Sequence, residues 1–206
     1  MCNACNSPTS VVFSGGNQAS SPHNQNVIQY ITMASAGNAT DFGDLTLKAR
    51  SAAGGTASSN TRGLILICNS SPNNNLNNIE FITIASTGNA TDFGDLFTGR
   101  YGAASCSNLN RAVFLGGRTP SNSNVIDYIT IASAGNATDF GDLTAANYFY
   151  GASSNNTRVV WVSDASTNVM EFVTIATTGN ASDFGDQNGT PQHLAGVTSD
   201  SHGGLE

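Results

Sequence analysis

Paired aspartates are the residues of this 206-residue chain whose spacing could do chemistry. Each pair stands in the tetrapeptide Asp-Phe-Gly-Asp, which occurs four times. Two neighbouring carboxylates could act as acid and base in glycoside hydrolysis, and together with nearby Asn side chains they could supply oxygen ligands to calcium. The paired positions are Asp41 and Asp44, Asp92 and Asp95, Asp139 and Asp142, and Asp183 and Asp186.

Neither the reaction nor the ion matches the pattern closely. Glycoside hydrolysis needs two carboxylates in unlike environments, whereas repeated pairs imply repeated environments. Calcium loops carry a bidentate Glu and a denser spacing of acids than this chain has. The sequence therefore predicts a protein that is not an enzyme and has no cofactor, with calcium binding and an Asp-dependent glycan hydrolase as the alternatives.

The cysteines give no further chemical site. Cys2 and Cys5 have the spacing of metal ligands, but no second Cys or His pair follows at a zinc-finger distance. Cys106 stands in a series of small residues, at the place held elsewhere by Ala57 and Ser153. We predict that Cys106 is a small buried residue and not a nucleophile.

The composition excludes several classes of partner. Only 10% of the residues are charged, the net charge is -7, and no Lys/Arg cluster is present, which argues against nucleic-acid binding. No apolar run is long enough to span a membrane, and residues 1–10 lack the basic and apolar regions of a secretory signal. We expect residues 1–10 to be flexible and residues 205–206 to be a cloning remnant, and the sequence assigns no compartment.

The paired aspartates belong to a longer repeated phrase, which reads ITIASTGNATDFGDL at residues 82–96. Successive copies of its first Asp lie 44 to 51 residues apart, close to the period of about 40 to 50 residues that is typical of propeller blades. An Asn precedes each pair by three residues. These Asn positions are Asn38, Asn89, Asn136 and Asn180.

We interpret the phrase as a structural turn that every repeat needs. Gly37 is predicted to take a positive φ, and Asn38 and Asp41 to hydrogen-bond their own backbone. The Phe of the tetrapeptide is predicted to pack between neighbouring repeats. Asp41 or Asp44 is predicted to pair with an arginine of the neighbouring hairpin, at the position that Arg62 occupies in its repeat.

The elements around the phrase predict four short strands in each repeat. An apolar run such as 64–67 precedes the phrase, a strand such as 125–131 opens it, and a short strand such as 139–143 closes it. Small residues then form an innermost strand, as at 102–107. We therefore predict an all-β fold, a four-bladed β-propeller over residues 11–204 with four antiparallel strands in each blade.

The chain ends predict how this propeller closes. The last small-residue segment, 194–199, has no blade of its own, while the first blade begins at its second strand, 11–14. Pairing these two segments would complete the first blade from both termini and remove its exposed edges. The expected result is a closed monomeric ring.

The repeats resemble the kelch family. Gly15-Gly16 and Gly116-Gly117 match its diglycine, Tyr30 and Tyr128 match its tyrosine, and the Phe of each tetrapeptide stands where kelch repeats have Trp. The phrase is also similar to repeats in structural and tail-associated proteins of tailed bacteriophages, marine ones in particular. That second resemblance implies a virion component, located in the virion or the host cytoplasm.

The two faces of the predicted ring differ in sequence. The repeated hairpins share one face, which we call the constant face, and loops of varied length share the other, the variable face. We predict a non-enzymatic binding module that engages a protein or a surface glycan through the variable face; a purely structural assembly component is the alternative. The predicted contact residues are Tyr148, Phe149, Tyr150, Tyr101, Arg100, Arg50 and Arg118.

Overall fold

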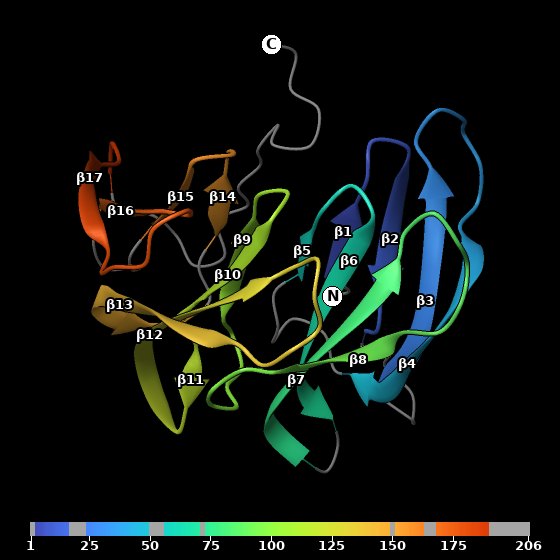
Figure 1. Ribbon diagram of the computed structural model, residues 1–206, viewed down its shortest axis with the longest axis horizontal. Coiled ribbons are helices and arrows are strands. Elements are labelled where there is room, and N and C mark those ends of the chain that lie inside the picture. The colour runs from blue at the N-terminus through green and yellow to red at the C-terminus, as the bar shows by residue number, and fades with distance from the viewer. Residues whose placement is uncertain are drawn as a thin grey trace.

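The computed structural model describes residues 3–16, 24–49, 56–70, 73–148, 151–162 and 168–189. Within these ranges the chain forms strands β1 to β17 and no helix, which confirms the all-β prediction. The strands build four antiparallel sheets, each with four strands in chain order from one edge to the other (Figure 1). The third sheet carries one additional short strand, β11.

The sheets have the following strands. The first contains β1 (Asn3–Asn6), β2 (Ser10–Ser14), β3 (Gln25–Thr32) and β4 (Thr40–Ala49). The second contains β5 (Thr56–Ser58), β6 (Arg62–Ser70), β7 (Asn73–Thr83) and β8 (Thr91–Asp95). The third contains β9 (Ala104–Ser107), β10 (Arg111–Leu115), β11 (Arg118–Thr119), β12 (Ser121–Thr130) and β13 (Thr138–Asn147). The fourth contains β14 (Ala152–Ser154), β15 (Arg158–Val162), β16 (Val169–Thr174) and β17 (Ser182–Asp186).

The first strand of the first sheet comes from the N-terminal segment. β1 pairs with β2, with Cys5 opposite Val12, and both side chains are buried. β1 thus lies at the edge beside β2 that is predicted for residues 194–199, and residues 3–6, within the segment expected to be flexible, form a strand. The small residues of β1 fit the innermost position in the same way as those of the other sheets. Residues 194–199 lie outside the described residues.

Apolar side chains on both faces of the sheets form three core clusters, one at each junction between successive sheets. In β6, Leu64 and Leu66 belong to the cluster shared with the third sheet, whereas Ile65 and Ile67 belong to the cluster shared with the first. A strand that has a sheet on each side therefore needs apolar residues at consecutive positions, without the usual alternation of polar and apolar residues.

The small-residue strands β1, β5, β9 and β14 lie next to one another at the centre of the molecule. Their hydroxyl groups join neighbouring sheets: Ser107 Oγ donates to the Ser58 carbonyl at 2.8 Å, and Ser154 Oγ donates to the Ser107 carbonyl at 2.8 Å. Cys106 lies among them and is buried, and burial raises the pKa of its thiol to about 12. Its position matches the prediction of a small buried residue.

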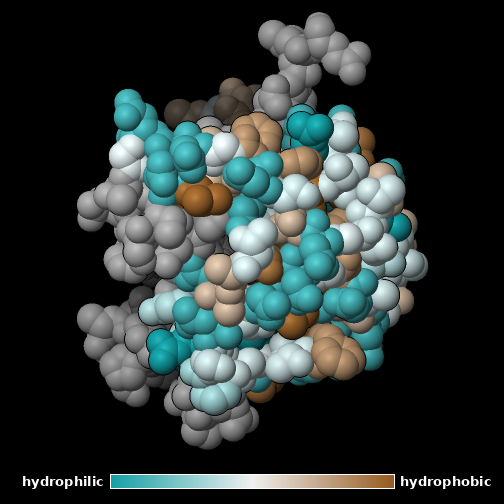
Figure 2. Space-filling view, turned by 90° about the vertical axis from the view of Figure 1, so that its left-hand side faces the viewer, coloured by the Kyte–Doolittle hydropathy of each residue, from teal (hydrophilic) through white to brown (hydrophobic). Residues whose placement is uncertain are grey.

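The four sheets follow one another in a row whose first and last members lie on opposite sides of the molecule (Figure 1). Among the described strands, the extensive contacts between sheets join successive sheets. The end of the row that carries β17 has a mainly hydrophilic surface with scattered apolar side chains (Figure 2). No helix in the described part of the chain is long and apolar enough to cross a membrane.

Candidate binding site

The Asp-Phe-Gly-Asp tetrapeptide contains a β-bulge that turns its Phe into the junction. Gln29 pairs with Asp41 and Ile28 with Gly43, so Phe42 is the extra residue between them. Its ring is buried and meets the Tyr30 ring edge-on, with 5.8 Å between centroids. The bulge requires a left-handed backbone at Gly43, with φ +148°.

This geometry confirms one sequence prediction and corrects another. Phe42, Phe93 and Phe140 all pack between neighbouring sheets as predicted. A positive φ occurs at the Gly of every tetrapeptide, because the bulge sits inside the strand. In the hairpin turn Gly37 has none, and of its equivalents Gly135 has a φ of +159°. Phe184, in the last copy, is 47% exposed because no described sheet covers it.

The Gly-Asn-Ala of the phrase binds the edge strand of the preceding sheet. Gly88 N donates to the Phe42 carbonyl at 2.7 Å, and Ala90 N donates to the Asp44 carbonyl at 2.8 Å. The Asn89 Oδ1 accepts from Asp44 N at 3.0 Å. The same three hydrogen bonds recur at the second and third junctions.

These contacts explain why the phrase is constant. One half of it forms the edge of a sheet, and the other half binds the edge of the sheet before it, so the second and third copies must each fit two partners. The prediction that the Asn of the phrase bonds its own backbone is therefore wrong for Asn89, Asn136 and Asn180. It holds for one aspartate, since Asp183 Oδ1 accepts from Gly185 N at 2.9 Å.

The Arg at the start of the second strand of a repeat contacts a ring and carbonyl groups. Arg62 lies 4.9 Å from the centroid of the Phe81 ring and donates to the Ile131 carbonyl at 2.8 Å. The prediction that this Arg pairs with Asp41 or Asp44 is wrong. Among the described residues, the only ion pair joins Arg100 and Asp127.

A buried acid lies at each junction, beneath the loops of the variable face. Glu80, Asp127 and Glu171 occupy equivalent positions opposite the first Asp of their tetrapeptides and are at most 1% exposed. Glu80 accepts hydrogen bonds from Thr46 of the preceding sheet, through both Thr46 N and its hydroxyl. These acids are not among the residues predicted from the sequence, although an acid flanked by apolar residues in a buried strand was the available signal.

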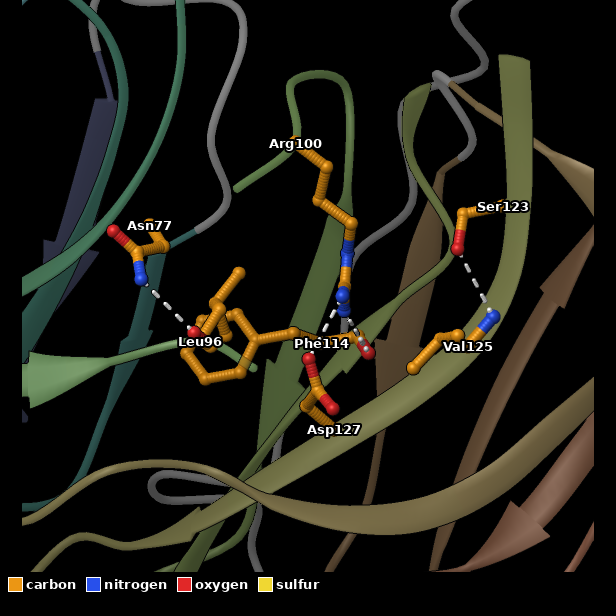
Figure 3. A network of polar contacts seen from close by, with 7 residues as sticks. All are labelled: Asn77, Leu96, Arg100, Phe114, Ser123, Val125 and Asp127. Atoms are coloured by element: carbon orange, nitrogen blue, oxygen red, sulfur yellow. Dashed lines mark hydrogen bonds and ion pairs between the residues drawn. The ribbon is translucent and has the colours of Figure 1, made fainter. Parts of the chain in front are cut away.

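The middle acid has an arginine as its partner (Figure 3). Arg100 Nη1 lies 2.8 Å from Asp127 Oδ2, and both residues are completely buried. Arg100 Nη2 also approaches the Phe114 carbonyl, at 3.5 Å. Burial raises the pKa of the Asp127 carboxyl above its ordinary value of 3.8, and the charge of Arg100 opposes that rise.

Three predicted contact residues come together on the variable face. Tyr101 and Arg118 exchange backbone hydrogen bonds of 3.2 and 2.8 Å, which join the loop after β8 to the short strand β11. The Arg118 guanidinium lies 5.5 Å from the centroid of the Tyr148 ring, at the end of β13. Arg118 Nε donates to the Pro120 carbonyl at 3.0 Å, which fixes the side chain. Tyr101, Arg118 and Tyr148 therefore form one cluster, which we call the Tyr-Arg-Tyr cluster.

The other predicted contact residues do not join this cluster. Arg100 is buried with Asp127, so it supports the loop from below and offers no contact surface. Arg50, Phe149 and Tyr150 lie outside the described residues. Sequence reasoning missed Phe97, which is 81% exposed at the start of the Tyr101 loop and stands where the first and third repeats have Thr.

No family model and no curated protein matches this chain. The kelch and phage resemblances therefore remain predictions, although Gly15, Gly16, Gly116 and Gly117 all have the positive φ that a diglycine turn uses.

The described residues hold no group of three or more His, Cys, Asp or Glu side chains placed to bind a metal ion. The Asn oxygen that calcium would need already accepts a hydrogen bond at each of the three junctions. We expect millimolar calcium to leave the melting temperature unchanged, as measured by differential scanning calorimetry with a chelator-treated control. A rise that depends on calcium dose would contradict this, because a ligand of the native state must stabilise it.

Proposed function

We propose that the four sheets are the blades of a β-propeller and that the protein is a non-enzymatic binding module. The module engages a protein or a surface glycan through the variable face. The observation that carries this proposal is the Tyr-Arg-Tyr cluster, in which three chain segments are joined by the backbone pairing of Tyr101 with Arg118 and by the contact of the Arg118 guanidinium with the Tyr148 ring. The same proposal includes that its repeats are kelch-like and that it is a virion or tail-associated component of a phage.

The chemistry of the cluster supports binding. Tyr and Arg are the residue types enriched in interface hot spots, because they bury a large area and still form hydrogen bonds. Here the backbone pairing of Tyr101 with Arg118 keeps their loops in place, and Gly117 N donates to the Asn147 carbonyl at 2.8 Å beside them. A held cluster loses little entropy when it binds. The exposed Phe97 ring adds an apolar surface on the same loop.

A glycan array and a panel of purified proteins would identify the ligand, and variants would then locate its site. We expect Arg118→Ala and Phe97→Ala each to weaken binding by about 2 kcal/mol, roughly thirtyfold, with little change in melting temperature. Leu109→Ala is the matched control, since Leu109 is 42% exposed on the constant face. Loss of binding in the Leu109 variant alone would place the ligand site on the constant face and contradict the proposal.

A second candidate function, a structural building block, is favoured by the two ends of the row. Met33 of the first sheet is 49% exposed, whereas its equivalents Ile84 and Ile131 are at most 6% exposed, because the preceding sheet covers them. Phe184 at the other end is 47% exposed. The two ends thus carry the two complementary halves of the contact that joins successive sheets.

We expect these two ends to bind each other, and an engineered disulfide tests it. In a Cys2→Ser background, Asn38→Cys and Asp186→Cys place thiols at the positions equivalent to Asn136 and Asp95, where Asn136 Oδ1 lies 3.1 Å from Asp95 N. Oxidation followed by non-reducing electrophoresis then gives the result. A bridge within one chain supports the predicted closed ring, and a bridge between chains supports assembly. A pair that forms neither, while the internal control Asp95→Cys with Asn136→Cys does, contradicts the expectation.

A further inference from the structure

A hollow of about 480 Å³ lies on the constant face, at the junction of the first and second sheets. Tyr30 and Phe42 of the first sheet line it. Ser10 and the residues Ile84 and Ala85 of the second sheet also line it. The equivalent places at the other two junctions each hold an arginine side chain.

The strand register establishes this equivalence. Ser10 pairs with Thr32 in the first sheet, as Arg62 pairs with Thr83 in the second and Arg111 pairs with Thr130 in the third. Ser10 therefore stands at the position where the next two sheets have Arg.

Each of these arginines bridges from a ring of its own sheet to carbonyl groups of the next. Arg62 covers Phe81 and donates to the Ile131 carbonyl. Arg111 lies 4.6 Å from the centroid of the Tyr128 ring and donates to the Ile175 and Ala176 carbonyls, both at 3.0 Å. The guanidinium thus stacks on a ring and satisfies carbonyl oxygens at the same time.

The first junction keeps the residues that receive the guanidinium but lacks the arginine. Tyr30 occupies the place of Tyr128, and Ile84 and Ala85 occupy the places of Ile175 and Ala176. A Ser side chain at position 10 is too short to reach across to the second sheet. The hollow includes the space that an arginine side chain at position 10 would occupy.

We propose that this hollow is a binding site for a guanidinium group supplied by a ligand or by an arginine side chain of a partner. A planar guanidinium stacks on an aromatic ring and presents N–H groups in a fixed fork, so it satisfies the ring and adjacent carbonyls together. An ammonium group is a compact, strongly hydrated charge and lacks this shape. The net charge of -7 also favours a cationic ligand.

Titration with N-acetyl-arginine methylamide, followed by NMR of the native protein, tests the proposal. We expect saturable shifts of the Tyr30 and Ile84 signals in the millimolar range, and at least a tenfold weaker response to the lysine analogue. Tyr30→Phe keeps the ring and is expected to retain binding, whereas Tyr30→Leu is expected to lose it. Equal responses to the arginine and lysine compounds, or no saturable shift with either, would overturn the proposal.

A filled-site variant gives an independent measurement. Ser10→Arg should raise the melting temperature by a few degrees and abolish the titration shifts, because its own guanidinium occupies the hollow. Asn110→Arg is the matched control, since Asn110 is exposed on the same face and does not line the hollow. Unchanged melting of the Ser10 variant together with retained ligand shifts would refute the site. An arginine-containing peptide that binds tighter than the single amino acid identifies a protein as the source of the group.

Discussion

Replacing Gly94 with alanine is expected to lower the free energy of unfolding by about 3 to 5 kcal/mol. A Cβ at this position would lie 2.4 Å from the Gly135 carbonyl oxygen and 2.5 Å from its carbon, so two backbones at the second junction would have to separate. The backbone itself has φ +140°, which adds strain for any L side chain. Urea unfolding followed by circular dichroism measures the loss.

Two control variants separate the causes of this effect. Gly185 has nearly the same backbone, φ +130°, but no atom lies within 4 Å of its hypothetical Cβ, so Gly185→Ala should cost only the conformational strain, about 1 to 3 kcal/mol. Gly88 has open space and no left-handed φ, so Gly88→Ala should be nearly neutral. If Gly94→Ala lowers the free energy of unfolding no more than Gly185→Ala does, the close approach of the neighbouring sheet does not contribute to the loss.

The strands of this fold could be predicted from local sequence, whereas its contacts between sheets could not. Runs such as 64–67 identify a strand covered on both faces, because burial on each side removes the alternation of polar and apolar residues. The positive φ at Gly43 depends on a bulge, and a bulge depends on the register with the partner strand. The role of Asn89 likewise depends on the preceding sheet, because its side chain bonds Asp44 and not its own turn.

The same distinction applies to the candidate site. Tyr101, Arg118 and Tyr148 were predicted to share a face because their loops fall at the same end of the repeated hairpins, and the structure brings them together. Arg100 was predicted to lie on that surface because it directly precedes Tyr101 in the same loop. Its burial is decided by Asp127, an acid from another sheet that the local pattern does not reveal.

Arg100→Met is expected to destabilise the protein by about 3 to 5 kcal/mol at neutral pH, because it leaves the Asp127 carboxylate buried without an opposite charge. Removing both charges should be much less harmful, since a buried ion pair replaced by apolar side chains of similar volume is often neutral. The comparison therefore uses Arg100→Met alone and combined with Asp127→Leu. Equal losses in the single and double variants would show that packing, and not the unpaired charge, determines the cost.

The pH dependence of the single variant provides the sharper test. Because burial raises the pKa of Asp127 above 3.8, the folded protein binds a proton more readily than the unfolded chain between that value and its own raised pKa. The contribution of Asp127 to stability therefore falls as the pH rises through this window.

Removing Arg100 takes away the charge that opposes the rise in the Asp127 pKa, so the window widens towards neutral pH. We expect the deficit of Arg100→Met relative to the unmodified protein to be largest near pH 7 and to shrink as the pH falls towards 3.8, because the buried carboxyl takes up a proton on the way. Urea unfolding at a series of pH values measures it, and a deficit that stays constant across the series would mean that Asp127 is not the group left unpaired.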